Sequence, residues 1–154
     1  MKIIKNKGIA TLPTMMVIGM VALAVVVSVT AITFNELLIS QGSAQSASAL
    51  FYAESGARDA LMKIARDKNY TCSAADCYSI DFVEGGCANG TDCSLVSVSS
   101  GVGTTADPKI ITSKGIMRAS IRTMQVSVIL DDGTTDVSLQ NGEITSSSWA
   151  ELVE

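Results

Sequence analysis

The chain has 154 residues with 15 acidic and 11 basic side chains, so its formal net charge is −4, and it contains no histidine. None of these charges lies between Lys7 and Glu36, a stretch of 28 residues. Such a stretch excludes a wholly soluble cytoplasmic protein. The acidic balance argues against a nucleic-acid binder, because phosphate binding depends on Lys and Arg. Without histidine, a nucleophile motif or a phosphate loop, the sequence predicts neither an enzyme nor a cofactor or metal site.

The uncharged stretch from Gly8 to Asn35 predicts a transmembrane helix. Thr14 to Phe34 supplies the roughly 20 apolar residues that a membrane span needs. A secretory signal peptide has a shorter apolar core of about 7–15 residues, and the small residues of 44–49 lie well past the apolar end. Three basic residues precede the stretch: Lys2, Lys5 and Lys7. This charge bias predicts a single-pass protein with a cytoplasmic N-terminus and an exported remainder.

A short basic leader that ends in Gly8, followed at once by an apolar helix, resembles the type IV prepilin pattern. In that family a membrane peptidase cuts after the glycine and methylates the new N-terminus. The resemblance therefore implies cleavage between Gly8 and Ile9 and methylation of Ile9. The alternative is a plain uncleaved anchor, in which Gly8 has no such role.

The sequence departs from the commonest pilin pattern at Pro13. Most pilins carry glutamate as the fifth residue of the mature chain, and counting from Ile9 that position is Pro13. In the family this glutamate is thought to neutralise the terminal amine of a neighbouring subunit, and a charge in an apolar core is costly unless it is paired. Members that lack the glutamate include tip subunits, so the departure favours a minor or tip subunit.

Residues 36–68 predict an amphipathic helix that continues the apolar one. Acid-first pairs four residues apart, Glu54–Arg58 and Asp59–Lys63, support the helix. Gly42, followed by the Ser-rich segment 43–48, predicts a bend where the chain leaves the membrane. Apolar residues recur at helical spacing along one face, which predicts a packing face: Ala47, Leu50, Ala53, Ala57, Leu61 and Ile64.

Within this helix the sequence F-Y-A-E-S-G resembles the PilX-type N-terminal domain of minor pilins, and the resemblance extends over residues 1–68. Its residues are Phe51, Tyr52, Ala53, Glu54, Ser55 and Gly56. The resemblance implies an α+β fold, the pilin-like lollipop, with a long N-terminal helix, transmembrane in its first half, packed on a small C-terminal antiparallel β-sheet. The implied segments are a leader (1–8), a transmembrane and filament-core helix (9–35), an amphipathic helix (36–68), a cysteine-containing loop (69–93) and the sheet (94–154).

The resemblance implies a structural subunit of a type IV pilus or related filament, and it does not separate a role in adhesion or motility from one in secretion or uptake. It would be anchored in the inner membrane until assembly and lie on the cell surface afterwards. The implied partners are other pilin subunits through the N-terminal helix, the prepilin peptidase, the inner-membrane assembly platform and the lipid bilayer, with no direct nucleic-acid contact. Two alternatives stay open: a type II secretion or competence pseudopilin, and a single-span membrane-anchored extracytoplasmic binding module.

Four cysteines lie in residues 69–93: Cys72, Cys77, Cys87 and Cys93. Turn signals predict a loop there with at most one short strand near Tyr78–Val83. Outside the cytoplasm disulfides persist, and the four cysteines allow three connectivities, of which local and nested pairing are both open. A zinc site is the alternative, although the spacing fits its paired knuckles poorly. Glycosylation sequons begin at Asn69 and Asn89.

From Ser94 onward, alternation with period two predicts an antiparallel meander of about four strands, covered by the helix face. In the longest run Met124, Val126, Val128 and Leu130 are expected to share one face. The expected strand runs are Leu95–Ser99, Ile110–Ser113, Ile116–Leu130, Thr134–Leu139 and Glu143–Ser147, with turns at Asp132-Gly133 and Asn141-Gly142.

Two further features of this region have competing interpretations. A calcium site at the aspartates of the first turn (Asp131, Asp132 and Asp136) is the alternative to a plain turn, but the closing glutamate of an EF-hand loop is missing. Trp149, the single tryptophan, is expected to pack on the sheet edge rather than to bind a ligand.

Overall fold

The computed structural model describes residues 11–130 and 142–152. The chain divides into two compact units, residues 1–41 and 42–154. One helix, α1 (Thr11–Arg66), contributes to both units. It remains helical at Gly42 and through the serines that follow, so the sequence does not interrupt the helix where a bend was expected. Lys63 and Arg66 lie in the last turn, where positive charge complements the helix dipole.

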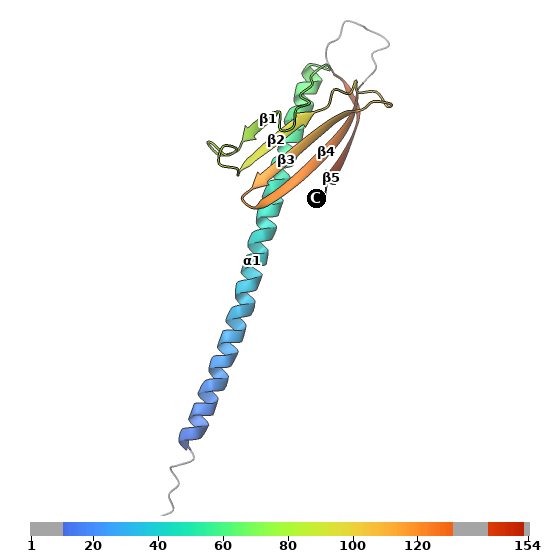
Figure 1. The fold of residues 1–154 in the computed structure, drawn as a ribbon. Helices are drawn as coiled ribbons and strands as arrows, with labels where there is room; N and C mark the ends of the chain where they lie inside the picture. The colour runs from blue at the N-terminus through green and yellow to red at the C-terminus, as the bar shows by residue number, and fades with distance from the viewer. Residues whose placement is uncertain (1–10, 131–141, 153–154) are drawn as a thin grey trace, which may run out of the picture. The chain divides into compact units, whose positions relative to one another are not determined.

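In the described part of the second unit, five antiparallel strands form one sheet in the order β1-β2-β3-β4-β5 (Figure 1). This order confirms the predicted meander, and β1 lies where the sequence predicted a short strand. The bounds are β1 (Tyr78–Asp81), β2 (Cys93–Val98), β3 (Lys109–Met117), β4 (Ser120–Leu130) and β5 (Ile144–Leu152).

The predicted run Ile116–Leu130 is not one strand. A two-residue turn at Arg118-Ala119 divides it, and Met117 pairs with Ser120 across the hairpin. Arg118 has φ 53°, the left-handed conformation that such tight hairpin turns use. Neither turn residue is Gly, Asn or Asp, so the usual sequence signal for this turn is missing.

Several features predicted after Leu130 fall on residues that the structure does not describe. The turn at Asp132-Gly133, the strand Thr134–Leu139, Asn141 and the aspartates at 131, 132 and 136 lie outside the described residues. The last predicted strand corresponds to β5, which is longer than expected and pairs directly with β4. β4 therefore has β3 on one side and β5 on the other, so both edges of β4 are paired.

The core of the second unit lies between α1 and one face of the sheet. The predicted inward face of β4 is confirmed, because Val126, Val128 and Leu130 are buried and Met124 packs against them. The predicted helix face is confirmed in its later part, where Ala57 and Ile64 are buried and Leu61 packs against the core. It differs in its earlier part, where Ala47 is exposed and Leu50 is only half-buried. The residues that α1 buries are mostly small: Ala49, Ala53, Gly56, Ala57, Ala60 and Ile64.

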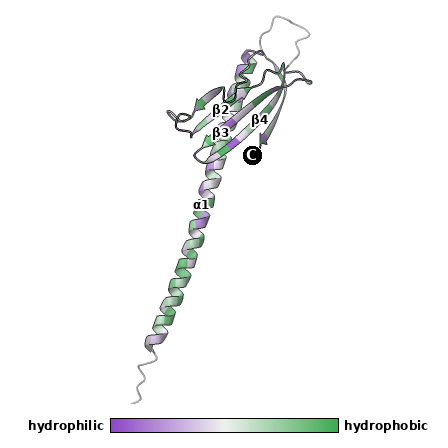
Figure 2. Ribbon diagram, in the orientation of Figure 1, coloured by the Kyte–Doolittle hydropathy of each residue, from purple (hydrophilic) through white to green (hydrophobic). Residues whose placement is uncertain are grey.

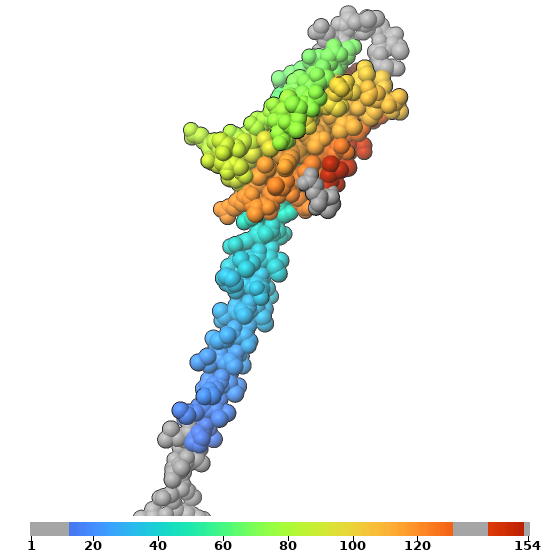
Figure 3. Space-filling model, viewed as in Figure 1, coloured from blue at the N-terminus to red at the C-terminus, as the bar shows by residue number. Residues whose placement is uncertain are grey.

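The other face of the sheet is more polar. Alternate residues such as Thr112, Gln125 and Ser127 point away from the core and are half-buried. Figure 3 views the sheet from this side, where β3 and β4, in orange, are seen without a covering element. The sheet therefore has one face packed on a helix and one face turned outward, as antiparallel sheets commonly do.

Candidate functional site

The apolar part of α1, residues 13–41, is called the stem here. Between Met15 and Ile39 its large apolar side chains are each 51–74% exposed. Figure 2 shows this segment in green, the colour of hydrophobic residues. By length and composition α1 contains a segment that could span a membrane. Exposed apolar surface of this extent requires a cover of lipid or protein.

Three hydroxyls within the stem are satisfied by the helix itself. The hydroxyls of Ser28, Thr30 and Thr33 donate to the carbonyls four residues earlier, at 2.8, 2.8 and 3.0 Å. In an apolar medium an unpaired hydroxyl costs several kcal/mol. These three hydroxyls therefore add no requirement for a polar partner.

The start of the helix bears on the predicted pilin features. Pro13 is the third residue of α1, within the first turn, where its missing N–H removes no intrahelical bond. The first turn contains no acidic residue. The predicted cleavage site at Gly8 and Ile9 and the basic residues Lys2, Lys5 and Lys7 lie outside the described residues.

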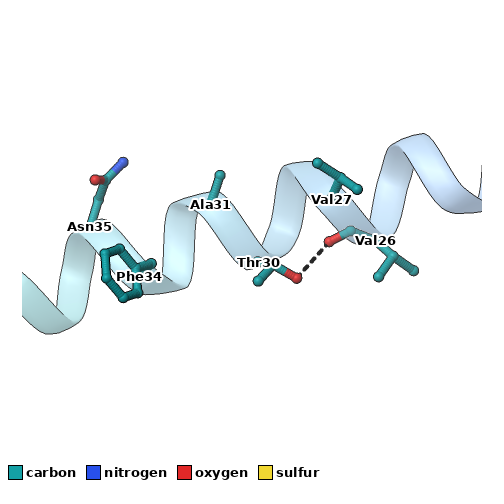
Figure 4. Close-up of a pocket in the computed structure, with 6 residues that line it drawn as sticks. All are labelled: Val26, Val27, Thr30, Ala31, Phe34 and Asn35. Carbon is teal, nitrogen blue, oxygen red and sulfur yellow. Dashed lines mark hydrogen bonds between the residues drawn. The ribbon is translucent and has the colours of Figure 1, made fainter.

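A shallow groove of about 580 Å³ lies on the stem (Figure 4). Val27, Thr30, Ala31 and Phe34 line it, with Val26 and Asn35 at its ends. The four central residues have the spacing i, i+3, i+4, i+7, which is the hole into which a side chain of a facing helix inserts in knobs-into-holes packing. The Thr30 hydroxyl is turned to the Val26 carbonyl, so the groove is mostly apolar, with the Asn35 amide at one end.

The residues of the F-Y-A-E-S-G motif have distinct environments. The Tyr52 ring stacks on Phe82 at a centroid distance of 4.2 Å, and its hydroxyl donates to Asp92 at 3.3 Å. Glu54 pairs with Arg58 at 2.6 Å, as its spacing predicts. Ala53 is buried, whereas Phe51 is 61% exposed. Burial, and then the negative charge and hydrogen bond of Asp92, raise the pKa of Tyr52.

Gly56, the last residue of the motif, lies against the sheet. A Cβ atom there would overlap the hydroxyls of Ser94 and Ser113 and come within 2.9 Å of Val96. Gly115 on β3 has the reciprocal position, because a Cβ there would overlap the Ala49 carbonyl and lie 2.5 Å from the Ala53 nitrogen. Small residues on both elements therefore let helix and sheet backbones approach closely. The motif glycine has a packing role.

The four cysteines form the local pairs that the sequence left open. Cys72 and Cys77 have a Cα–Cα distance of 5.7 Å, and Cys87 and Cys93 one of 5.2 Å. Both distances fall in the range that disulfides require. Cys93 is the buried first residue of β2, and Cys72 exchanges backbone hydrogen bonds with Val98 at the end of β2. Each pair thus ties a loop to the same strand.

Lys109, on the inner face of β3, was not singled out from the sequence. Only 2% of it is exposed, and its ammonium donates to the Gly101 carbonyl at 2.9 Å. Burial lowers the pKa of Lys109, and the charges of Asp67 and Asp107 oppose that shift. The Ile110–Ile111 alternation predicts an inward Lys109, but lysine is seldom buried, so the residue type concealed it.

Aromatic residues at the two sides of the sheet also contact α1. Trp149 lies on the edge strand β5, as expected, and the Arg58 guanidinium lies 5.7 Å from its ring centroid. On β1, the Lys63 ammonium lies 3.3 Å from the ring centroid of Tyr78. Burial, and then Asp59, raise the pKa of Tyr78. Aromatic residues of both edge strands, β1 and β5, therefore contact the helix.

Comparisons with family models, with curated proteins and with solved structures give no match to this chain.

Proposed function

We propose that the chain is a structural subunit of a type IV pilus or a related filament, anchored in the inner membrane until assembly. The observation that carries this proposal is the pairing of two properties in one helix. Its first part is a stem that carries no charge from Pro13 to Asn35 and exposes apolar side chains, and its later part packs a small antiparallel meander. A single stem of this kind serves first as a membrane anchor and then as the interior of a filament.

Three features of the stem support the proposal. Its charge gap lets it lie in lipid or among other stems. Its internally bonded hydroxyls let it do either without a polar partner. Gly8, the first residue of the gap, supplies the position at which a prepilin peptidase would cut and leave Ile9 as the methylated N-terminus.

Pro13 in place of glutamate favours a minor or tip position. An interior subunit would need a carboxylate to compensate the terminal amine of its neighbour, because an unpaired charge in an apolar core is costly. A tip subunit has no neighbour ahead of it and needs no such carboxylate. The first turn of α1 supplies no acidic residue in its place.

Mass spectrometry of the N-terminus, in membrane and sheared-filament fractions from cells with an active prepilin peptidase, tests the proposal. We expect a chain that begins at N-methylated Ile9, and Gly8→Ala should leave the leader uncleaved. A chain that retains Lys2 to Lys7 in those cells would contradict a pilin-like role and favour a membrane-anchored binding module.

A further inference from the structure

We infer that the β3–β4 hairpin contacts the headgroups of the membrane that the stem crosses, with Lys114 and Arg118 facing anionic phospholipids. The inference rests on one part of the proposed function, the anchoring of the stem in a membrane, and not on assembly into a filament. It applies to the chain before assembly, and it names a lipid surface as a partner of the second unit.

Basic side chains are concentrated in the hairpin. Residues 108–130 contain four basic residues and no acidic one, in a chain whose formal net charge is −4. Of the four, Lys109 is buried, and Arg122 pairs with Glu151 at 3.1 Å. Within the part of the chain that the structure describes, Lys114 and Arg118 form no ion pair. Their charges are therefore available to an anionic surface.

Two apolar side chains lie between these two charges on the outward face of the hairpin. Ile116 and Ile121 are paired directly across the two strands, and Ile121 is 49% exposed. Gly115 faces α1, so its neighbours Lys114 and Ile116 face outward, and Arg118 occupies the turn. At a membrane interface apolar side chains enter the acyl boundary while cations bind headgroups, and this patch supplies both groups.

Arg118 occupies a position that the backbone alone would give to glycine. Its φ of 53° is left-handed, a conformation that glycine adopts at lower cost than any residue with a Cβ. The backbone N–H of Arg118 donates to the Thr91 hydroxyl at 2.7 Å, which ties the turn to the β1–β2 loop, residues 82–92. Because glycine would keep this hydrogen bond, the hairpin does not need arginine to fold. The exposed side chain adds a positive charge at the tip.

The hairpin lies at the end of the second unit where the stem joins it. Ser113 packs at Gly56 of α1, whereas Gly115, two residues further along β3, packs at Ala49. β3 therefore runs toward the start of the second unit, and its turn follows Gly115 by three residues, about 10 Å (Figure 1). Gly42, where the unit begins, is three residues from the last exposed apolar side chain of the stem. A chain of that length spans at most about 11 Å, so this end stays close to the membrane surface.

Acidic residues at the same end of the sheet belong to β1 and the β1–β2 loop. The Asp81 carboxylate accepts a hydrogen bond from the Cys87 N–H at 2.8 Å, and the Asp92 carboxylate accepts one from the Tyr52 hydroxyl at 3.3 Å. Glu84 is exposed. Anionic lipids repel these carboxylates, so the contact is assigned to the hairpin and not to the whole end of the unit.

Quenching of a fluorophore by spin-labelled lipid headgroups tests the inference. Full-length Ala119→Cys, at the turn, and Thr105→Cys, in the loop at the other end of β3, are labelled and inserted into nanodiscs. The native cysteines are paired and do not react. In phosphatidylcholine with about 30% phosphatidylglycerol, quenching at 119 should exceed that at 105 at least about threefold. It should fall in pure phosphatidylcholine and at high salt.

Arg118→Gly separates lipid contact from folding. Since glycine is favoured at this φ, the melting temperature should be unchanged or higher, while quenching at 119 in the anionic nanodiscs should fall by up to about fivefold. Lys114→Gln should also lower the quenching. Lys68→Gln is the matched control, because Lys68 lies beside Gly142 at the opposite end of the unit, and it should leave the quenching unchanged.

Three results would each overturn the inference: equal quenching at the two labelled positions, quenching that does not respond to phosphatidylglycerol, or equal effects of Lys68→Gln and Arg118→Gly. A chain that does not insert into nanodiscs would overturn both the inference and the membrane anchor. A chain that inserts but keeps its leader in cells contradicts the filament function alone.

Discussion

Ser94 on β2 and Ser113 on β3 hydrogen-bond to each other at 2.9 Å, with both side chains fully buried. The pair lies directly beneath Gly56 of α1. Two polar groups are thus placed at the closest approach of helix and sheet, where each satisfies the other. Burial of this kind is tolerated because neither hydroxyl is left unpaired.

Replacing one serine of this pair should cost more than replacing both. Ser94→Ala or Ser113→Ala leaves the other hydroxyl buried without its partner, and we expect a loss of about 1–3 kcal/mol of unfolding free energy. The double variant removes both hydroxyls and should lose less than the sum. Urea unfolding of the four proteins in detergent gives the coupling. Additive single effects would show that the hydrogen bond contributes nothing.

Gly56→Ala should destabilise the second unit by about 1–3 kcal/mol, because the new methyl group overlaps the two serine hydroxyls. Gly42→Ala is the matched control on the same helix, since nothing lies within 4 Å of its added Cβ. The free energy of unfolding of that control should rise by about 1 kcal/mol, because alanine has a higher helix propensity than glycine. Thermal unfolding followed by circular dichroism compares them.

Gly115→Ala should be the more severe of the two glycine substitutions at the crossing. Its methyl group meets the helix backbone at Ala49 and Ala53, which cannot rotate away as a serine hydroxyl can. The combination of Gly56→Ala with Ser94→Ala should recover part of the loss at Gly56, whereas no side-chain truncation should rescue Gly115→Ala. An equal melting temperature for Gly115→Ala and wild type would refute the close approach.

The disulfide pairing can be read from one digest. Glu84 is the glutamate between the two cysteine pairs, and cleavage after it separates Cys72 and Cys77 from Cys87 and Cys93. Under non-reducing conditions a glutamate-specific protease should release two unlinked peptides, each lighter than its reduced form by two hydrogens. A single linked peptide would indicate nested or crossed pairing and would contradict the local pairs. Loss of either bond should cost about 2–4 kcal/mol.

Stability should fall as pH rises above about 10, partly through Tyr52. In the folded state its pKa is raised from 10.0, so the unfolded chain releases that proton first. The unfolded state then binds fewer protons than the folded state, and unfolding becomes more favourable as pH rises through this window. Tyr52→Phe keeps the stack on Phe82 and should make the decline of stability with pH less steep. At neutral pH it should lower the free energy of unfolding by about 1 kcal/mol, because the hydrogen bond to Asp92 is lost. Denaturant titrations between pH 8 and about 11 measure both effects, and an unchanged slope would contradict the assignment.

The sequence predicted element types better than it predicted contacts. The stem is predicted by the length of its uncharged apolar run, the amphipathic continuation and β4 are predicted by periodicity, and each appears in the structure. The hairpin at Arg118-Ala119 was missed because its residues carry no turn signal, although Arg118 adopts a left-handed conformation. A turn of this kind is imposed by the pairing of β3 with β4.

The contact face of α1 was predicted correctly at its C-terminal end and wrongly at its N-terminal end. Helical spacing suggested Ala47 and Leu50 there, but the structure buries Ala49 and Gly56, because the sheet approaches closest where side chains are smallest. Periodicity alone does not distinguish a helix face that fills space with large side chains from one whose small side chains let the two backbones approach closely. The cysteine pairing was likewise undecided, since spacing allows several loops and the strand that anchors them was not known.

The self-contained hydroxyls of the stem have an energetic consequence. Ser28, Thr30 and Thr33 keep their hydrogen bonds whatever lies outside the helix, because donor and acceptor belong to the same turn. Moving the segment from one apolar surrounding to another breaks none of these bonds. These three hydroxyls therefore contribute little to the free-energy difference between those surroundings.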